Sequence, residues 1–264
     1  MEGIRADRQG EVLEVVIDRE HAANSLDPTA HAAMAGILDD FEADDRLRVA
    51  IVTGVGDRFF CAGHDLKSVD PGARIPLPAT GFGGLTARPA LEKPVISAVN
   101  GLALGGGAEL VLASHLVVAA EHAELALTEV LVGMVAAAGG VVRLPRRIPS
   151  SVALELILTG RRIGAAEAER WGLVNRVVPR GCALTGARLL ADSVLGASPT
   201  SVRLSLRLLN LSRARSEVDP DPDEVAQLLD ELLASPDTAE ALAAFRERRN
   251  PVWAMRGGPA EPDT

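Results

Sequence analysis

The first half of the chain alternates between short apolar runs and segments that have the spacing of an amphipathic helix. The apolar runs of strand length are residues 11–17, 48–53, 94–99, 116–120 and 124–127. Between the first two runs, Asp27 and Pro28 form a helix-start signal, and apolar residues from Met34 to Phe41 follow at helical spacing. Strands that alternate with helices usually pair in parallel, so this half of the chain predicts an α/β architecture.

Beyond about residue 145 the pattern becomes almost entirely helical. Helical spacing covers residues 150–159, 165–171, 183–195, 201–211, 223–234 and 237–248, and one short apolar run at 174–178 interrupts it. Residues 70–84 are rich in Gly and Pro, so we expect a mobile loop there. The whole pattern predicts an α/β core followed by a helical C-terminal region.

Composition narrows the classes of function that the chain can have. The 264 residues are 47% hydrophobic and carry a formal net charge of −9. An acidic chain without a basic stripe gains no counterion release on nucleic acid, so we expect no nucleic-acid partner. Two cysteines, Cys61 and Cys182, give neither a disulfide framework nor metal-ligand spacing, which favours a reducing, cytoplasmic location and no metal.

Residues 98–120 are mostly apolar and are the one stretch that resembles a membrane span. They include Asn100, Glu109 and His115, and a carboxylate in the centre of a bilayer is costly. Buried core is therefore the better interpretation. The N-terminus also lacks the apolar centre of a signal peptide, so no membrane partner is expected.

Two segments that contain glycine are candidates for binding a ligand through the backbone. The first is CAGHDLK, residues 61–67, which follows an apolar pair and alone is most simply a tight turn. The second is NGLALGGGAEL, residues 100–110, in which three glycines open an apolar helix. A helix that begins in this way presents N–H donors and partial positive charge to a ligand. Neither a dinucleotide fingerprint nor a P-loop is present.

Two glutamates are candidates for acid/base chemistry. Glu109 lies in the first turn of the helix that the glycines open, among Leu110, Val111 and Leu112. A carboxylate in such surroundings is paired, protonated or functional. Glu129 follows a short strand and, taken alone, would be an ordinary first-turn carboxylate of a helix.

Together these segments resemble the crotonase (enoyl-CoA hydratase/isomerase) family. The matching segments are CAGHDLK, KPVISAVNGLALGGGAEL, TEVLVG, LTGRRIGAAEAERWGLVNRVV and AAFRERRNPVW. Hydratase members of the family carry two glutamates twenty residues apart, which is the separation of Glu109 and Glu129. Within the family, the pattern is most similar to the carnitinyl-CoA dehydratase and enoyl-CoA hydratase subgroup.

The resemblance implies a fold, an assembly and a site. It implies a spiral of repeated ββα units over residues 1–195, a helical oligomerisation region over residues 196–264, and a homotrimer or a dimer of trimers. Glu109 and Glu129 would be the catalytic pair, and the backbone N–H groups of His64 and Gly106 would form an oxyanion hole. The residues expected to contact the substrate and its CoA moiety are Ala62, His64, Asp65, Leu66, Lys67, Gly105 and Gly106. No separate cofactor is expected, because coenzyme A is part of the acyl-CoA substrate.

The implied activity is reversible syn hydration of an enoyl-CoA, or dehydration of a 3-hydroxyacyl-CoA, through a stabilised enolate. A Δ3,Δ2-enoyl-CoA isomerase or another acyl-CoA enzyme of this fold is the alternative, although an isomerase needs one base and has no use for a second carboxylate. The imidazole of His64 departs from the smaller residue common at that position, and we interpret it as a side chain that lines the pocket. The segment 136–142 also departs from the family pattern, which leaves the identity of the substrate open.

Overall fold

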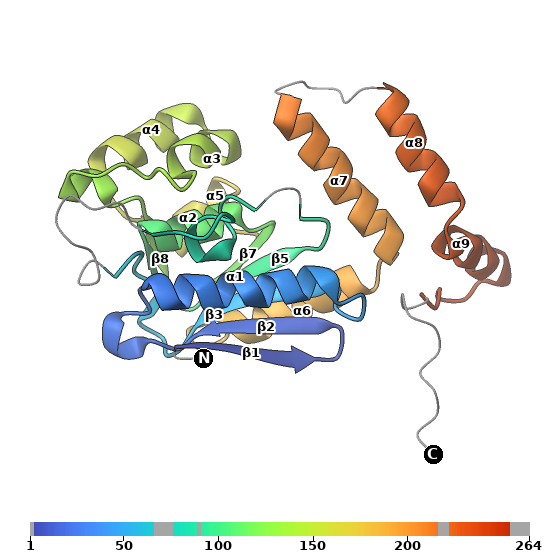
Figure 1. Cartoon of the computed structure of the whole chain (residues 1–264), viewed down its shortest axis with the longest axis horizontal. Helices are drawn as coiled ribbons and strands as arrows, with labels where there is room; N and C mark the ends of the chain where they lie inside the picture. Colours follow the sequence, from blue (N-terminus) through green and yellow to red (C-terminus); the bar gives the residue numbers. More distant parts are fainter. Residues whose placement is uncertain (1–2, 66–75, 89–90, 216–221, 254–264) are drawn as a thin grey trace, which may run out of the picture.

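The strands form two sheets in the computed structural model, which describes residues 3–65, 76–88, 91–215 and 222–253 (Figure 1). The six-stranded sheet has the order β1-β2-β3-β5-β7-β10 and the four-stranded sheet the order β4-β6-β8-β9. The strands are β1 Ile4–Gln9, β2 Val12–Ile17, β3 Val49–Gly54, β4 Phe59–Cys61, β5 Val95–Val99, β6 Leu102–Leu104, β7 Leu116–Ala120, β8 Glu124–Ala126, β9 Ile163–Gly164 and β10 Arg176–Val178. From β2 to β10 the strands of the larger sheet are parallel. At one edge, β1 pairs with β2 in an antiparallel hairpin.

The chain alternates between the two sheets from one strand to the next. After β3 in the larger sheet the chain enters β4 in the smaller one, and the same step is repeated from β5 to β6 and from β7 to β8. A helix follows β6 and another follows β8, so the chain advances as a spiral of strand pairs and helices. This arrangement confirms the predicted α/β fold with repeated ββα units.

Helices cover both faces of the larger sheet. The helices are α1 Pro28–Ala43, α2 Gly106–Ala113, α3 Gly140–Arg147, α4 Ser150–Thr159, α5 Ala165–Arg170, α6 Ala183–Leu195, α7 Pro199–Arg215, α8 Pro222–Leu233 and α9 Pro236–Glu247, with shorter 3₁₀ turns η1 Glu20–Ala22, η3 Phe82–Gly84 and η4 Glu129–Val132. In Figure 1, α1 lies in front of the sheet, whereas α6 lies behind it and contacts β3, β5 and β7. Asp27 caps α1 by accepting a hydrogen bond from the N–H of Ala30 at 2.8 Å, as its place before Pro28 predicts.

The periodicity located the long elements better than the short ones. The helix expected at residues 150–159 is α4, with the same bounds, because its apolar positions recur at helical spacing. Strands β1, β4, β6 and β9 were not among the predicted strands. In β1 only Ile4 is buried, so this edge strand lacks the apolar alternation of a half-buried strand, and charged side chains such as Arg5 protect it. The expected loop at residues 70–84 ends in the buried turn η3; its residues 70–75 lie outside the described chain.

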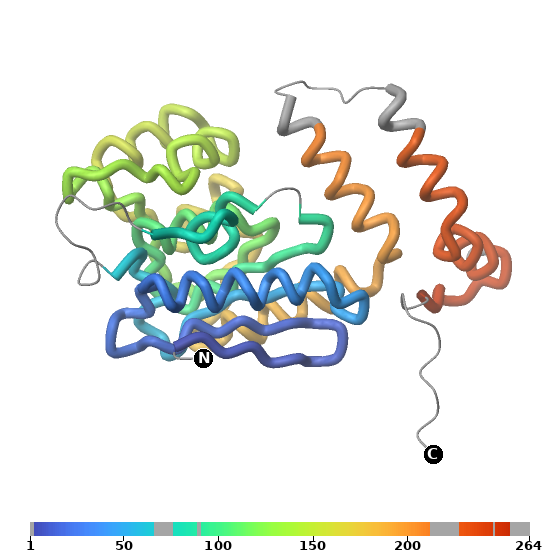
Figure 2. The backbone as a smooth tube through the Cα atoms, viewed as in Figure 1, coloured from blue at the N-terminus to red at the C-terminus, as the bar shows by residue number. Residues whose placement is uncertain are grey.

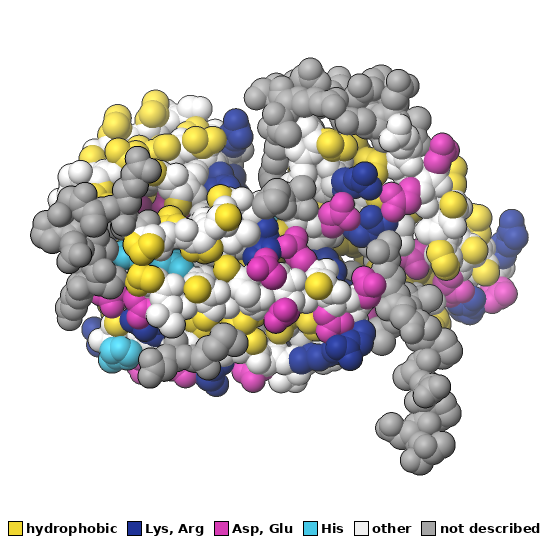
Figure 3. Space-filling model, viewed as in Figure 1, with side chains coloured by type: hydrophobic (Ala, Val, Ile, Leu, Met, Phe, Trp, Pro, Cys, Tyr) yellow, Lys and Arg dark blue, Asp and Glu magenta, His cyan; other side chains and the backbone are white. Residues whose placement is uncertain are grey.

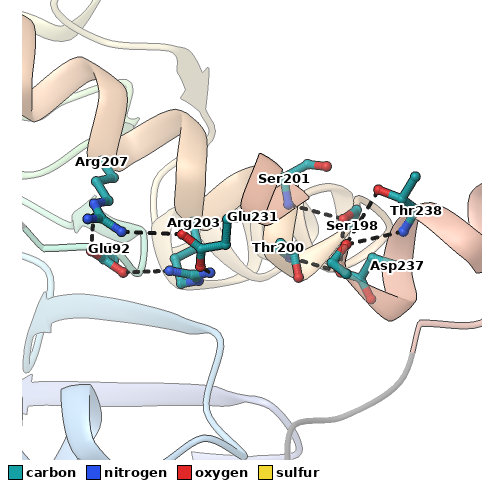
Figure 4. Close-up of polar contacts among 10 residues, drawn as sticks. Glu92, Ser198, Thr200, Ser201, Arg203, Arg207, Glu231, Asp237 and Thr238 are labelled. Carbon is teal, nitrogen blue, oxygen red and sulfur yellow. Dashed lines mark hydrogen bonds and ion pairs between the residues drawn. The ribbon is translucent and has the colours of Figure 1, made fainter. Parts of the chain in front are cut away.

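The C-terminal helices α7, α8 and α9 lie to one side of the sheets, in orange and red in Figure 2. Charged side chains join them to the core. Figure 4 shows Arg203 of α7 between two carboxylates, Glu92 of the core, at 3.1 Å, and Glu231 of α8. Near the start of α9, Asp237 accepts hydrogen bonds at 2.9 Å from Ser198 Oγ and from the N–H of Thr200.

The apolar stretch at residues 98–120 is divided among several elements. It contains the end of β5, then β6, the eight-residue helix α2 and β7. Within the described residues, no helix is both long enough and apolar enough to span a bilayer.

Candidate active site

Three neighbouring strands of the smaller sheet place the candidate residues at one edge. Strands β4, β6 and β8 are parallel neighbours, so their carboxyl ends lie side by side. The segment 62–65 follows β4, and Gly105 and Gly106 follow β6. Glu129 lies three residues beyond the end of β8. The structure therefore brings together residues that lie more than sixty positions apart in the sequence.

Backbone hydrogen bonds join the turn after β4 to the segment before α1. The N–H of Leu26 donates to the carbonyl of Gly63 at 2.9 Å, and the N–H of Asp65 donates to the carbonyl of Leu26 at 2.9 Å. Because the neighbours of His64 make both bonds, extended-chain geometry directs the N–H of His64 away from Leu26. Gly63 has φ +96°, a conformation that favours glycine and turns the chain at this point. The carboxylate of Asp65 lies 3.4 Å from the guanidinium of Arg19.

The turn after β6 packs directly against the turn after β4. A β-carbon placed at Gly63 would lie 3.2 Å from the nitrogen of Gly106, and one placed at Gly107 would overlap the carbonyl oxygen of Cys61. Gly63 and Gly107 therefore allow the backbones of the two turns to approach closely. Helix α2 begins at Gly106, and the N–H groups in its first turn have no acceptor within the helix. These N–H donors lie at the positive end of the helix dipole.

Glu109 lies buried in the first turn of α2, with only 3% of its surface exposed. Its Oε1 accepts a hydrogen bond from the N–H of Gly140 at 2.8 Å. Burial, and to a smaller extent the charge of Glu129, raise the pKa of Glu109 to about 7, although the N–H groups of Gly140 and Ala138 oppose the shift. Since the raised pKa lies close to neutral pH, Glu109 can both donate and accept a proton.

The carboxylate of Glu129, the first residue of η4, also lies at the start of α2. A β-carbon placed at Gly105 would lie 3.4 Å from its Oε1, so the carboxylate lies against the start of α2. Its Oε2 is buried and has no hydrogen-bond partner within the described part of the chain. Burial raises the pKa of Glu129 as well. A buried carboxylate oxygen without a partner is costly unless a ligand or water completes it.

His31 was missed as a candidate, and the structure places it against His64. Its ring lies on α1 and is fully buried, with Nε2 3.0 Å from Nδ1 of His64. A signal was present in the sequence, because His31 shares the buried face of the helix with Met34 and Leu38. A histidine on an otherwise apolar face requires a polar partner.

A groove of about 420 Å³ lies near Glu109. Its walls are the residues Leu77, Gly81, Phe82, Thr86 and Ala87 on one side and 137–139, Val142, Arg143 and Arg146 on the other. Gly139 lines this groove, and the next residue, Gly140, binds Glu109. Leu66 and Lys67, expected along the CoA moiety, lie outside the described residues. Within the described ranges, no three His, Cys, Asp or Glu side chains are grouped to hold a metal ion.

The arrangement supports one kind of chemistry. N–H groups at the start of a helix stabilise negative charge that develops on a bound carbonyl oxygen. The carboxylates of buried Glu109 and half-buried Glu129 lie next to them, and because burial raises the pKa of both, they can exchange protons with the same bound molecule. Proton transfer next to a stabilised enolate is the chemistry that these groups can perform together.

Comparison with known proteins leads to the same family. Residues 7–256 match the family model for enoyl-CoA hydratase/isomerase. The chain is 41% identical to "Carnitinyl-CoA dehydratase" of Proteus mirabilis (strain HI4320) over 94% of its own length and 97% of that protein. It superposes with a TM-score of 0.88 and 37% identity on the enoyl-CoA hydratase of Mycobacterium tuberculosis H37Rv, covering 97% of this chain and 100% of that one. For the carnitinyl-CoA hydratase of Mycobacterium avium the TM-score is 0.75, with 39% identity over 97% and 100% of the two chains. The chain belongs to the enoyl-CoA hydratase/isomerase family, the crotonase family that its motifs resemble.

Proposed function

We propose that this protein hydrates an enoyl-CoA and, in reverse, dehydrates a 3-hydroxyacyl-CoA. The observation that carries the proposal is that two carboxylates lie at the start of α2, the buried Glu109 and the half-buried Glu129, close enough for the charge of Glu129 to raise the pKa of Glu109. A hydro-lyase must handle one water and one proton on the same face of the double bond, and a carboxylate pair suits that task. The names of the relatives support a CoA thioester as the substrate.

The N–H groups of His64 and Gly106 form the oxyanion hole in this proposal. The thioester oxygen accepts from both groups, and the enolate that forms during the reaction strengthens both hydrogen bonds. Support comes from the close packing of the two turns, because Gly63 lies against the nitrogen of Gly106. Losing one such donor in an enzyme typically costs about 10²–10³-fold in rate.

Glu109 and Glu129 share the acid and base roles. For hydration, one ionised carboxylate accepts a proton from the water that attacks C3, and the other, protonated, delivers a proton to C2. The raised pKa of Glu109, about 7, supports a resting state near neutral pH in which the pair retains one proton. The unpartnered Oε2 of Glu129 supports a place for the water or the reacting carbon at that atom.

The CoA moiety follows the turn after β4 in this proposal. Ala62, Asp65 and Gly105 join the two oxyanion-hole residues in contact with the thioester and the pantetheine arm, and Leu66 and Lys67 continue along the CoA. No separate cofactor takes part, since acyl transfer to coenzyme A has already activated the substrate. The apolar Leu77 and Val142 in the groove suit an acyl chain, and Arg143 and Arg146 lie at its wall.

Isomerisation of a Δ3-enoyl-CoA is the competing activity. The test is to incubate the purified protein with crotonyl-CoA, a longer 2-enoyl-CoA, crotonobetainyl-CoA and a 3-enoyl-CoA. Loss of the enoyl-thioester absorbance with the first three substrates indicates hydration, whereas its appearance from the 3-enoyl-CoA indicates isomerisation. A protein that shifts the double bond and adds no water to any substrate would overturn the hydratase proposal.

We also propose that the protein assembles as a homotrimer or a dimer of trimers in the cytoplasm. Exposed hydrophobic side chains gather over α3 and α4 at the upper left of Figure 3. They include Leu154 and Leu158 of α4. Leu131 on η4 and Val135, three residues beyond its end, are 65% and 68% exposed. Apolar patches of this kind commonly mark interfaces between subunits. Light scattering at micromolar concentration that gave a stable monomer would contradict the proposed assembly.

A further inference from the structure

A pair of histidines joins helix α1 to the turn that carries the amide of His64. His31 is fully buried on α1, and its Nε2 lies 3.0 Å from Nδ1 of His64. The two rings are nearly parallel, with 7° between their planes and 5.2 Å between their centroids. This contact ties two segments that are thirty-three residues apart in the chain.

A backbone hydrogen bond determines where the protons of this pair lie. The N–H of Gly83 donates to Nδ1 of His31 at 3.0 Å, so that nitrogen keeps its lone pair. A neutral His31 therefore carries its proton on Nε2 and donates it to Nδ1 of His64. A neutral His64 must then carry its own proton on Nε2. The hydrogen bonds run in one direction, from Gly83 through His31 to His64.

Both rings are neutral at neutral pH. Burial lowers the pKa of His31 to about 4, with a further contribution from His64, and burial also lowers the pKa of His64. The nearby carboxylates Asp27 and Asp65 act in the opposite direction, and Arg19 lies 2.7 Å and 3.4 Å from them. At neutral pH, His31 and His64 therefore each carry one proton, on Nε2.

The same histidine also supports the turn above Gly106. The edge of the Phe82 ring meets the ring of His31, with centroids 4.6 Å apart and planes at 75°. Phe82 in turn lies on Gly106, where a β-carbon would come within 2.5 Å of its ring. His31 therefore contacts His64 directly and reaches Gly106 through the ring of Phe82. These are the two residues whose amides are proposed for the oxyanion hole.

We infer that His31 is a positioning residue that sets the spacing of the His64 and Gly106 amides through its Nε2–H···Nδ1 bond and its contact with Phe82. The inference rests on the proposed hydratase function. His31 does not touch the reacting atoms; it acts through the backbone of the residues that do. Misplacement of a reacting group by about 1 Å commonly costs about 10²-fold in rate, so a positioning bond at this place has a measurable effect.

The test compares two substitutions at one position. His31→Gln retains the two hydrogen-bonding roles, with an amide oxygen that can accept from Gly83 and an amide nitrogen that can donate to His64. His31→Leu fills similar space and makes neither bond. His21→Leu, at an exposed position on η1, is the matched control for replacing a histidine by leucine.

His31→Leu is expected to lower kcat for hydration by about 10- to 100-fold while KM changes by less than about threefold. It is also expected to weaken the ultraviolet shift of bound acetoacetyl-CoA toward its enolate. His31→Gln should restore most of both properties, and His21→Leu should match the parent protein. Parental kcat in His31→Leu would overturn the inference, as would an equal loss in the two folded His31 variants.

A second measurement keeps the inference testable where His31→Leu fails to fold. The ¹⁵N signals of the imidazole rings in the parent protein distinguish a nitrogen with a proton from one with a lone pair. Nδ1 of His31 and Nδ1 of His64 should both give lone-pair signals, and a proton on either would overturn the assignment. If the parent protein hydrates no enoyl-CoA, the proposed function fails, whereas the ring signals still report on the histidine pair.

Discussion

The start of α2 and the C-terminal helices are held in place by different means. At the start of α2, backbone lies against backbone, with Gly107 packed on the carbonyl of Cys61. Helices α7 and α8 are joined to the core and to each other by ion pairs such as Arg203 with Glu92 and Glu231, whose side chains are 16%, 37% and 39% exposed. Backbone packing leaves no room for one methyl group, whereas ion pairs in contact with water contribute only about 0–1 kcal/mol each. Positions are therefore tightly determined where we propose the chemistry and loosely determined at the C-terminal helices.

The largest expected effect is on catalysis. Glu109→Gln and Glu129→Gln each remove one proton-transfer group without changing the packing, so each should lower kcat for hydration by at least about 10². Isothermal titration with an unreactive CoA ester should give affinities close to the parental value. Near-normal turnover in either variant would show that the two carboxylates do not act as a pair.

The next effect tests the close packing at α2. Gly107→Ala places a methyl group against the carbonyl of Cys61, and we expect it to lower the free energy of unfolding by about 2–4 kcal/mol. The matched control is Gly36→Ala, since Gly36 lies on the exposed side of α1 with nothing within 4 Å of the added carbon. That change should stabilise the protein by about 0.5–1 kcal/mol. Denaturant unfolding of both variants measures the contrast, and equal effects would show that the turns have room to adjust.

A smaller effect concerns the pH dependence of stability. Because the pKa of Glu109 rises from 4.5 when unfolded to about 7 when folded, the folded state holds more protons between these pH values. Stability should therefore fall as pH rises through this window, and above it the ionised carboxylate destabilises the folded state. Glu109→Gln removes this penalty, so at pH 8 it should exceed the parent in free energy of unfolding by about 1–3 kcal/mol. At pH 4 the two proteins should be similar; a gap that did not grow with pH would contradict the assigned pKa shift.

The smallest effect is expected among the C-terminal helices. Arg203→Met keeps the apolar stem of the side chain and removes its ion pairs, which should cost about 1 kcal/mol or less in unfolding free energy. Arg207→Met, at a more exposed position near the same two glutamates, should cost still less. We expect kcat to stay within about twofold of the parental value in both variants. A loss of several kcal/mol would remove the contrast between the two regions.

The sequence predicted the long helices and the parallel core because both depend on the spacing of apolar residues. It also selected Glu109 and Glu129, whose placement beside one another was expected from the family motifs. It did not locate β6 or β9, which are too short to produce a periodic signal.

Contacts made through space were harder to predict than elements. The ring of His31 meets His64 only because the segment before α1 bridges to the turn after β4, and no local pattern encodes that bridge. The same holds for Gly140, whose amide binds Glu109 from a segment thirty-one residues away. The domain division at residue 195 and the assembly remain predictions.

The step of each strand pair from one sheet to the other has a consequence for how the chain acquires activity. The three turns at the site each belong to a different coil of the spiral. Leu26, from a segment before β3, bonds the first turn, and Gly140, from a segment after β8, bonds Glu109 in the second. Contacts between residues so distant in the chain form slowly, because a large loop must close before any of them is gained. A nascent chain that has left the ribosome as far as the end of α2 already contains the first two turns but neither Glu129 nor the amide of Gly140. Activity should therefore arise in a single late event during synthesis, when the segment that follows β8 closes over α2.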